Sequence, residues 1–169
     1  MKRLPIDAKT WLLLGALAAA ALLAGAHAFE IFGHYAPCEL CYKQRDVHWL
    51  AFWVGLLGFG AAFWRRSVAR PACLLLGFVF LGSTVLATWH AGIEWKWWPG
   101  PAACTGSHFH GVSASDMASL LSGAVHHVVQ CDEAAWRMFG ISMAGYNAAI
   151  SLVLAVLSFL FAYRSARRV

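Results

Sequence analysis

The stretch VHWLAFWVGLLGFGAAFW at residues 47–64 contains no Asp, Glu, Lys or Arg and is long enough to cross a bilayer as one helix. Three more stretches share this property, so we expect spans at about residues 11–29, 47–64, 71–92 and 141–163. Hydrophobic residues make up 60% of the 169 residues and charged residues only 12%, which excludes an ordinary soluble domain. The sequence therefore predicts a single-domain, all-α membrane protein built as a four-transmembrane-helix bundle.

The basic residues gather on one side of these spans. One cluster precedes the first span, one separates the second from the third, and one follows the fourth: Lys2, Arg3, Lys9; Arg65, Arg66, Arg70; Arg164, Arg167, Arg168. By the positive-inside rule both termini are cytoplasmic, and residues 30–46 and 93–140 form the outer loops. The net charge of +5 is thus mostly a topology signal, and nothing supports nucleic-acid binding. The first span also resembles a signal peptide, but we expect it to be retained because four spans agree with all three clusters.

The first outer loop carries a closely spaced cysteine pair, in Pro37-Cys38-Glu39-Leu40-Cys41-Tyr42-Lys43-Gln44-Arg45. A disulfide between Cys38 and Cys41 closes only a tiny ring and stabilises little, so the pair is typical of chemistry, either half of a zinc site or a redox dithiol. We expect both thiols at the outer surface, just before the second helix begins. The positive end of that helix, with Lys43 and Arg45, favours a thiolate at Cys41.

Two ionisable residues near the outer surface have open roles. Arg45 opposes both the helix dipole and the positive-inside bias. It either extends to lipid headgroups or supplies a fixed cation for a carbonyl of a lipid-soluble acceptor. His90, near the outer end of the third span, is either a hydrogen-bonded interfacial histidine or a contact of a ligand or quinone. Cys73, near the inner end, is most simply a small buried hydrophobe.

The second outer loop returns a second pair of cysteines to the membrane. Trp95, Trp97 and Trp98 indicate a segment at the membrane interface, and Cys104 follows in a Gly/Ser/His-rich stretch. Apolar residues then repeat at helical spacing, which predicts a short amphipathic surface helix leading to Cys131: Met117, Leu120, Leu121, Ala124, Val125, Val128.

The four outer cysteines can pair in three ways, and the short separation of the first two favours Cys38 with Cys41 and Cys104 with Cys131. Other classes of protein stay open at this point. Zinc held by these thiols and loop histidines, or haem held by His27, His48 or His90, would make a metal-binding or haem-binding membrane protein. Outer disulfides that merely brace the loops would make a structural tetraspan protein.

The motif Cys-x-Leu-Cys-x-x-Gln-Arg at residues 38–45 resembles the disulfide bond formation protein B family (DsbB), and four spans with two outer cysteine pairs match its plan. The sequence Trp98-Pro99-Gly100-Pro101 before Cys104 adds to the likeness. The resemblance covers nearly the whole chain. It implies a bacterial inner-membrane enzyme that reoxidises a DsbA-like, periplasmic thioredoxin-fold oxidase and passes the electrons to ubiquinone or menaquinone.

The resemblance also implies roles for individual residues. Cys104 would be attacked by the partner's thiolate, with Cys131 as its disulfide mate. Cys131 would then exchange with Cys38, and Cys41 would face the quinone. Arg45 and His90 would hold the quinone ring, and no metal is expected. The histidine-rich stretch between Cys104 and Cys131 departs from the family pattern and leaves the choice of partner open.

Overall fold

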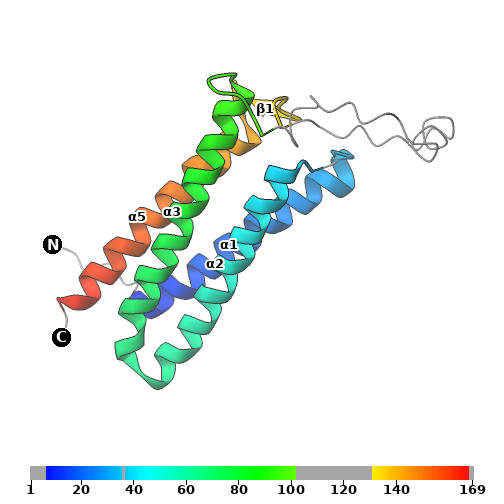
Figure 1. Ribbon diagram of the computed structural model, residues 1–169. Coiled ribbons are helices and arrows are strands. Elements are labelled where there is room, and N and C mark those ends of the chain that lie inside the picture. The colour runs from blue at the N-terminus through cyan, green and yellow to red at the C-terminus, as the bar shows by residue number, and fades with distance from the viewer. Residues whose placement is uncertain (1–6, 36, 102–130, 168–169) are drawn as a thin grey trace.

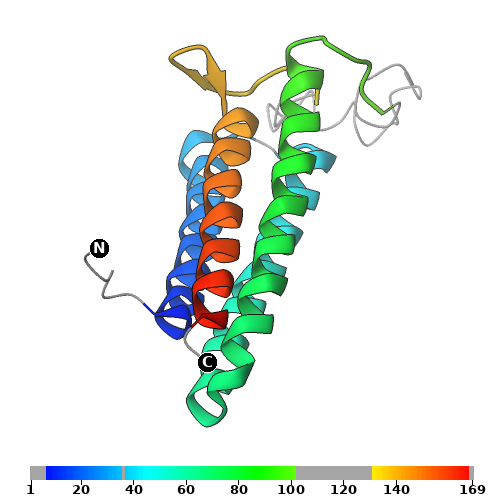
Figure 2. The ribbon, with the colours of Figure 1, turned by 90° about the vertical axis from the view of Figure 1, so that its left-hand side faces the viewer.

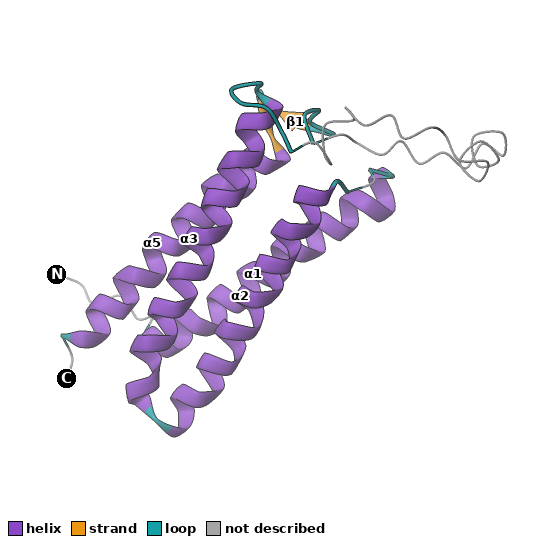
Figure 3. Ribbon diagram, in the orientation of Figure 1, coloured by secondary structure: helices purple, strands orange, loops and turns teal. Residues whose placement is uncertain are grey.

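The computed structural model describes residues 7–35, 37–101 and 131–167. In this part of the chain four helices are long and apolar enough to cross a membrane, which confirms the expected bundle (Figure 3). They are α1 (Ala8–Gly33), α2 (Glu39–Trp64), α3 (Ala69–Glu94) and α5 (Met143–Ala166), with a 3-10 turn η1 (Arg66–Val68) before α3. The expected amphipathic surface helix lies outside the described residues.

The helices are longer than the charge-free stretches because polar residues at a membrane surface extend a helix without entering the hydrocarbon. The largest difference concerns α2, which we expected at about residue 47 and which begins at Glu39. Cys41 and Arg45 therefore lie inside the helix, in its first and second turns. At α1 the cap is Asp7, whose carboxylate accepts a hydrogen bond from the Thr10 backbone N–H at 2.8 Å. This bond lowers the pKa of Asp7.

The four helices pack as two neighbouring pairs, α1 with α2 and α3 with α5 (Figures 1 and 2). The α2–α3 connection, the start of α1 and the end of α5 share one end of the bundle. The opposite end carries Cys38, a short strand pair and the segment that follows α3. We call this the thiol end.

Small residues let the helices approach closely. A Cβ atom added at Gly55 of α2 would lie 2.8 Å from the backbone oxygen of Leu12 in α1, so only glycine fits there. A Cβ atom at Gly58 would lie 2.9 Å from Cβ of Ala72 in α3. The main core is made of fully buried side chains from all four helices, including Leu12, Ala51, Leu76, Phe80 and Ala155.

A hairpin that the sequence did not predict leads into α5. Strands β1 (Arg137–Met138) and β2 (Ile141–Ser142) pair antiparallel across a two-residue turn. Phe139 and Gly140 in this turn both have positive φ, 51° and 79°, as tight hairpin turns require. The Tyr146 hydroxyl donates to the Met138 carbonyl at 3.0 Å, which fixes the hairpin on α5.

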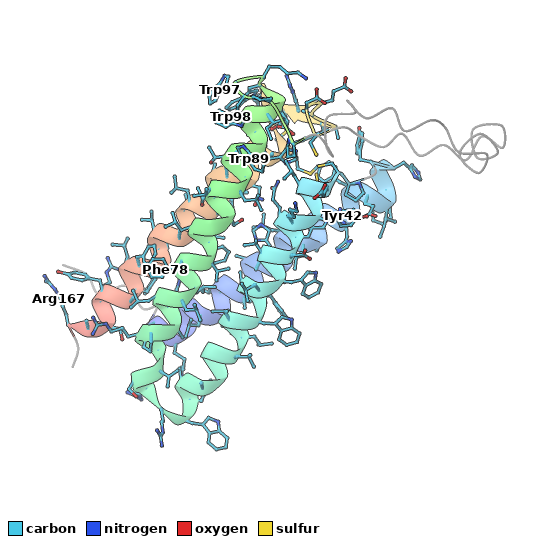
Figure 4. All side chains as sticks on the ribbon, viewed as in Figure 1. Tyr42, Phe78, Trp89, Trp97, Trp98 and Arg167 are labelled. Atoms are coloured by element: carbon cyan, nitrogen blue, oxygen red, sulfur yellow. The ribbon has the colours of Figure 1, made fainter. Side chains whose placement is uncertain are left out.

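The chain leaves α3 through a tight C-terminal motif. The backbone N–H groups of Lys96 and Trp97 donate to the carbonyls of Ile93 and Gly92, both at 2.9 Å, with Lys96 in the left-handed region at φ 60°. The Trp98 indole N–H donates to the Trp89 carbonyl at 3.0 Å. These tryptophans gather at the thiol end of α3 (Figure 4), the position expected for an interfacial aromatic segment.

Candidate active site

Two free thiols meet where α2 begins. Cys38 is the N-cap of α2, in extended conformation, and its Sγ accepts the backbone N–H of Cys41 at 3.3 Å. The two Sγ atoms lie 2.9 Å apart, and both cysteines are unlinked. Cys38 is 6% exposed. The spacing of the motif therefore puts both sulfurs on one side of the first helical turn.

The contacts that favour a thiolate converge on Cys38, which corrects the expectation that Cys41 carries the charge. The pKa of Cys38 lies well below its usual value, chiefly because of the hydrogen bond from the Cys41 thiol and then because of His90, with burial opposing both. His90 Nε2 lies 3.8 Å from Cys38 Sγ. Cys41 lies inside the first turn of α2 and not before the helix, as we expected. Cys38 is the residue at the cap position, where the positive end of the helix favours a thiolate.

The two nearby cations are also directed elsewhere than the sequence argument assumed. Lys43 pairs with Glu39 at 2.7 Å on the exposed face of α2. Arg45 Nη1 pairs with Glu30 Oε2 of α1 at 2.5 Å, and its Nη2 donates to the Ala26 carbonyl at 3.0 Å. Arg45 thus spans from α2 to α1 with its side chain only 11% exposed, which is a fixed position rather than an extension to headgroups.

His90 is buried at the centre of the site, with 3% of its surface exposed. Its Nδ1 lies 2.7 Å from Gln44 Nε2. The Gln44 oxygen in turn accepts from Asn147 Nδ2 of α5 at 2.6 Å. Glu94, one turn after His90, places Oε1 3.9 Å from His90 Nε2. The imidazole therefore lies between the thiols and a polar contact that joins three helices.

Cys131 brings the second outer loop to this site. It is 1% exposed, and its Sγ, Cys38 Sγ and a His90 ring nitrogen all lie within 4.8 Å of one another. Cys131 is disulfide-bonded, whereas Cys104 lies outside the described residues. Two cysteine sulfurs and an imidazole at such distances resemble part of a metal site, but the sulfur of Cys131 is in a disulfide and is not a thiolate ligand. Cys73 is buried at the other end of the bundle, where its thiol donates a hydrogen bond to the Ala8 carbonyl at 3.5 Å.

A cavity of about 240 Å³ lies beside the thiols. Arg45, His90 and the Cys41 sulfur line it, which brings the three expected contacts of an electron acceptor to one place. Much of the rest of the wall is apolar and comes from α1 and α5. Its other lining residues include Leu22, Leu23, Ala26, Phe29, Pro37, Met143, Ala144 and Ile150. An apolar wall with a few convergent polar groups is the usual form of a small-molecule site.

Sequence reasoning missed several residues of this site. Gln44 stood inside the cysteine motif without an assigned role, and Glu30 was read only as the end of the first span. Asn147 is an amide within an otherwise apolar span, and polar groups inside a membrane are commonly functional, so its type was an available signal. Which partner each side chain meets depends on the helix pairing, which the sequence alone does not give.

A reactive dithiol at the mouth of a helix bundle, with a disulfide-bonded third cysteine against it, defines a membrane thiol-disulfide oxidoreductase. Residues 8–161 match the family model described as disulfide bond formation protein DsbB. The chain belongs to this family, and it is a multi-pass disulfide-bond-forming oxidoreductase of the bacterial inner membrane. It is also 25% identical over 137 residues to the uncharacterized protein RP370 of Rickettsia prowazekii strain Madrid E, covering 79% of this chain and 76% of that protein.

Proposed function

We propose that this protein reoxidises a DsbA-like periplasmic thioredoxin-fold oxidase and passes the electrons to a membrane quinone. The observation that carries the proposal is the position of the Cys38/Cys41 pair, which lines a largely apolar cavity together with Arg45 and His90. A bracing disulfide needs no cavity and no cation beside it. A dithiol that gives electrons to a lipid-soluble acceptor needs both.

The first exchange takes place in the second outer loop. The partner's thiolate attacks Cys104 of the Cys104–Cys131 disulfide, so that a mixed disulfide forms and Cys131 leaves as a thiolate. The partner's second thiol then displaces Cys104, and the partner leaves oxidised. Two electrons and two protons have passed from the partner to this pair.

The second exchange joins the two cysteine pairs. The Cys131 thiolate attacks Cys38 of a Cys38–Cys41 disulfide, and Cys41 leaves as a thiolate. The separation of at most 4.8 Å between the sulfurs of Cys38 and Cys131 supports this step. Cys104 then attacks Cys131, which restores the loop disulfide and leaves Cys38 and Cys41 reduced.

The residues around the cavity fit a quinone ring. Arg45 supplies fixed N–H donors for a carbonyl oxygen, and Ala26 and Leu22 supply an apolar wall. His90 also lines the cavity, with its Nε2 3.8 Å from the Cys38 sulfur. A bound quinone, either ubiquinone or menaquinone, accepts two electrons and two protons. The Cys38/Cys41 dithiol loses the same number when its disulfide forms again.

The distribution of basic residues supports a topology with both termini in the cytoplasm and the cysteine pairs in the periplasm. The described basic residues of the three clusters lie at the end of the bundle that holds the start of α1 and the end of α5, which we assign to the cytoplasm: Lys9, Arg65, Arg66, Arg70, Arg164, Arg167. The thiol end is then periplasmic, where disulfides persist and a secreted oxidase is within reach.

Quinone reduction by purified protein in detergent tests the proposal, with a reduced thioredoxin-fold dithiol protein as donor and quinone absorbance as readout. We expect turnover in the wild type and in Cys73→Ala, the matched control, and none in Cys41→Ser or Cys104→Ser. No consumption of ubiquinone or menaquinone analogues, with a Cys131 disulfide that resists mild reduction, would favour a bracing role.

A further inference from the structure

A continuous row of polar side chains runs from Cys38 into the bundle. It passes from His90 of α3 to Gln44 of α2, then to Asn147 of α5 and back to His48 of α2. The contacts measure 2.7 Å between His90 Nδ1 and Gln44 Nε2, 2.6 Å between Gln44 Oε1 and Asn147 Nδ2, and 2.8 Å between Asn147 Oδ1 and His48 Nε2. Buried polar rows of this kind require every donor to meet an acceptor.

The two amides give the row a direction. An amide nitrogen only donates, so the contact with Gln44 Nε2 leaves His90 Nδ1 as the acceptor and puts the proton of neutral His90 on Nε2. Nε2 is the nitrogen that faces Cys38 Sγ at 3.8 Å. At the other end Asn147 Oδ1 only accepts, so His48 carries its proton on Nε2. His48 Nδ1 is then a bare acceptor, and among the described residues it has no hydrogen-bond partner.

If the Gln44 amide were turned round, its oxygen would accept from His90 Nδ1, and neutral His90 would have no proton on Nε2, the nitrogen that faces the sulfur of Cys38. A thiolate at Cys38 and a bare ring nitrogen both offer lone pairs, so this arrangement gives up the hydrogen bond. Which direction the row takes is decided at Asn147, since Asn147 presents its N–H to Gln44 only while its oxygen is held by other donors. The chief donor is His48 Nε2 at 2.8 Å. The Ser151 hydroxyl is the weaker one, because it lies 3.2 Å away and can give its single proton to Ser83 Oγ at 3.1 Å instead.

We propose that Asn147 and His48 are positioning residues that together orient the Gln44 amide, so that His90 presents an N–H to the sulfur of Cys38. Both act through other side chains rather than by touching the thiols. The inference rests on the proposed function only for the role that it gives to the thiolate.

The other titratable groups that face Cys38 do not belong to this row. They are the Cys41 thiol of α2, the Glu94 carboxyl of α3 and, once its disulfide is reduced for the assay below, the Cys131 thiol. Substitutions at Asn147 or His48 leave all three in place. A change in the titration of Cys38 in such variants therefore reports on His90.

The test is the pH dependence of Cys38 alkylation by iodoacetamide in the full-length reduced protein in detergent, followed by mass spectrometry of the Cys38 peptide. We expect Asn147→Leu to raise the midpoint by about one pH unit, the loss of one hydrogen bond to a charged group. His48→Leu raises it in the same direction. His48→Gln, which keeps an N–H near the Nε2 position, leaves the wild-type midpoint.

Ser151→Ala is the matched control, because it removes a second donor from the same Asn147 oxygen while His48 still holds it. An unchanged midpoint in Asn147→Leu would overturn the proposal, as would an equal rise in Ser151→Ala, which would indicate general loosening of the bundle. If Asn147→Leu does not accumulate in membranes, the smaller Asn147→Ala is measured with the same expectation. The assay contains no quinone and no partner, so failure of the proposed function appears only in the turnover assay.

Discussion

At Cys38 three contacts act on one sulfur: the Cys41 thiol, the Cys41 backbone N–H and the His90 imidazole. Each stabilises negative charge, and together they outweigh the cost of burying it. The attacked sulfur of the proposed exchange is thus also the sulfur that best carries charge as a thiolate. A sulfur of this kind is a good leaving group, so the bond between Cys38 and Cys131 is poised to break again.

The lowered pKa of Cys38 links pH to the stability of the reduced protein. A group whose folded pKa lies below its unfolded value, about 8.5 for a thiol, gives stability that is complete above the unfolded value and lost as pH falls through the folded one. We expect the melting temperature of the reduced wild type to fall, relative to Cys38→Ser, as pH decreases across that window. Thermal unfolding in detergent at several pH values checks this. A constant difference between the two proteins would contradict it.

Arg45 gives a prediction about the acceptor. We expect Arg45→Met to raise the quinone KM by about 10-fold to 100-fold, because a hydrogen bond to a charged group contributes about 1.5–3 kcal/mol. Lys43→Met is the control, since Lys43 pairs with Glu39 on the exposed face of the same helix. Steady-state quinone reduction measures both variants. Equal effects of the two substitutions would argue against a specific contact.

At the scale of the helices, the site depends on how closely α1 approaches α2. Gly55 has no room for a methyl group against the α1 backbone, whereas nothing lies within 4 Å of a Cβ atom added at Gly60. We expect Gly55→Ala to reduce the free energy of unfolding by about 1–3 kcal/mol, the usual cost of overpacking. Denaturant unfolding in micelles checks this against Gly60→Ala, which should match the wild type. Destabilisation by both would contradict a packing effect specific to Gly55, since alanine favours a helix more than glycine does.

The segment that carries Cys131 is tied to the end of α3 by one ion pair, Lys96 Nζ to Asp132 Oδ2 at 2.6 Å. This pair also offsets the negative charge that Asp132 places beside Cys131. We expect Asp132→Asn to slow exchange between Cys131 and Cys38 by about twofold to fivefold, because exposed ion pairs contribute at most about 1 kcal/mol. Quenched-flow alkylation measures the rate. Lys9→Gln removes a charge at the other end of the bundle, at the start of α1, and should leave the rate unchanged.

The helices themselves were predictable from the sequence because hydrocarbon demands continuous apolar stretches, and such stretches are legible without a structure. The ends of the helices were harder to predict. Residues 39–46 are polar and carry no membrane signal, yet they form the first turns of α2 and hold Cys41 and Arg45. The Phe139-Gly140 hairpin also escaped prediction, since it lies at the boundary between the expected outer loop, residues 93–140, and the expected last span, and neither signal indicates a strand pair.

For the molecule as a whole, the family motif located the first two thiols and Arg45, and the wider family resemblance pointed to His90; the structure brings all of them to one cavity. The motif could not locate Asn147 or Glu30, because each matters only through a contact between helices distant in sequence. Periodicity describes one helix at a time. The polar row that surrounds His90 is a property of three helices together.

The proposed topology makes a prediction for the entire chain. Alkaline phosphatase fused after Arg167 should be inactive, because the proposed topology assigns the end of α5 to the cytoplasmic side. The same reporter fused after Pro99, beyond the thiol end of α3, should be active. Phosphatase assays on intact cells measure both fusions. The reverse pattern would indicate that the dithiol faces the cytoplasm, where it could not meet a periplasmic partner, and would contradict the proposal.

Helix α5 is synthesised after α1, α2 and α3, and it supplies Asn147 and the cavity residues Met143 and Ile150. A nascent chain therefore contains Cys38 and Cys41 before the wall of the cavity beside them is complete. We expect chains stopped after α3 to retain no quinone on membrane extraction, whereas chains that include α5 do. The order of synthesis would then withhold the proposed electron acceptor from the dithiol until α5 is in place.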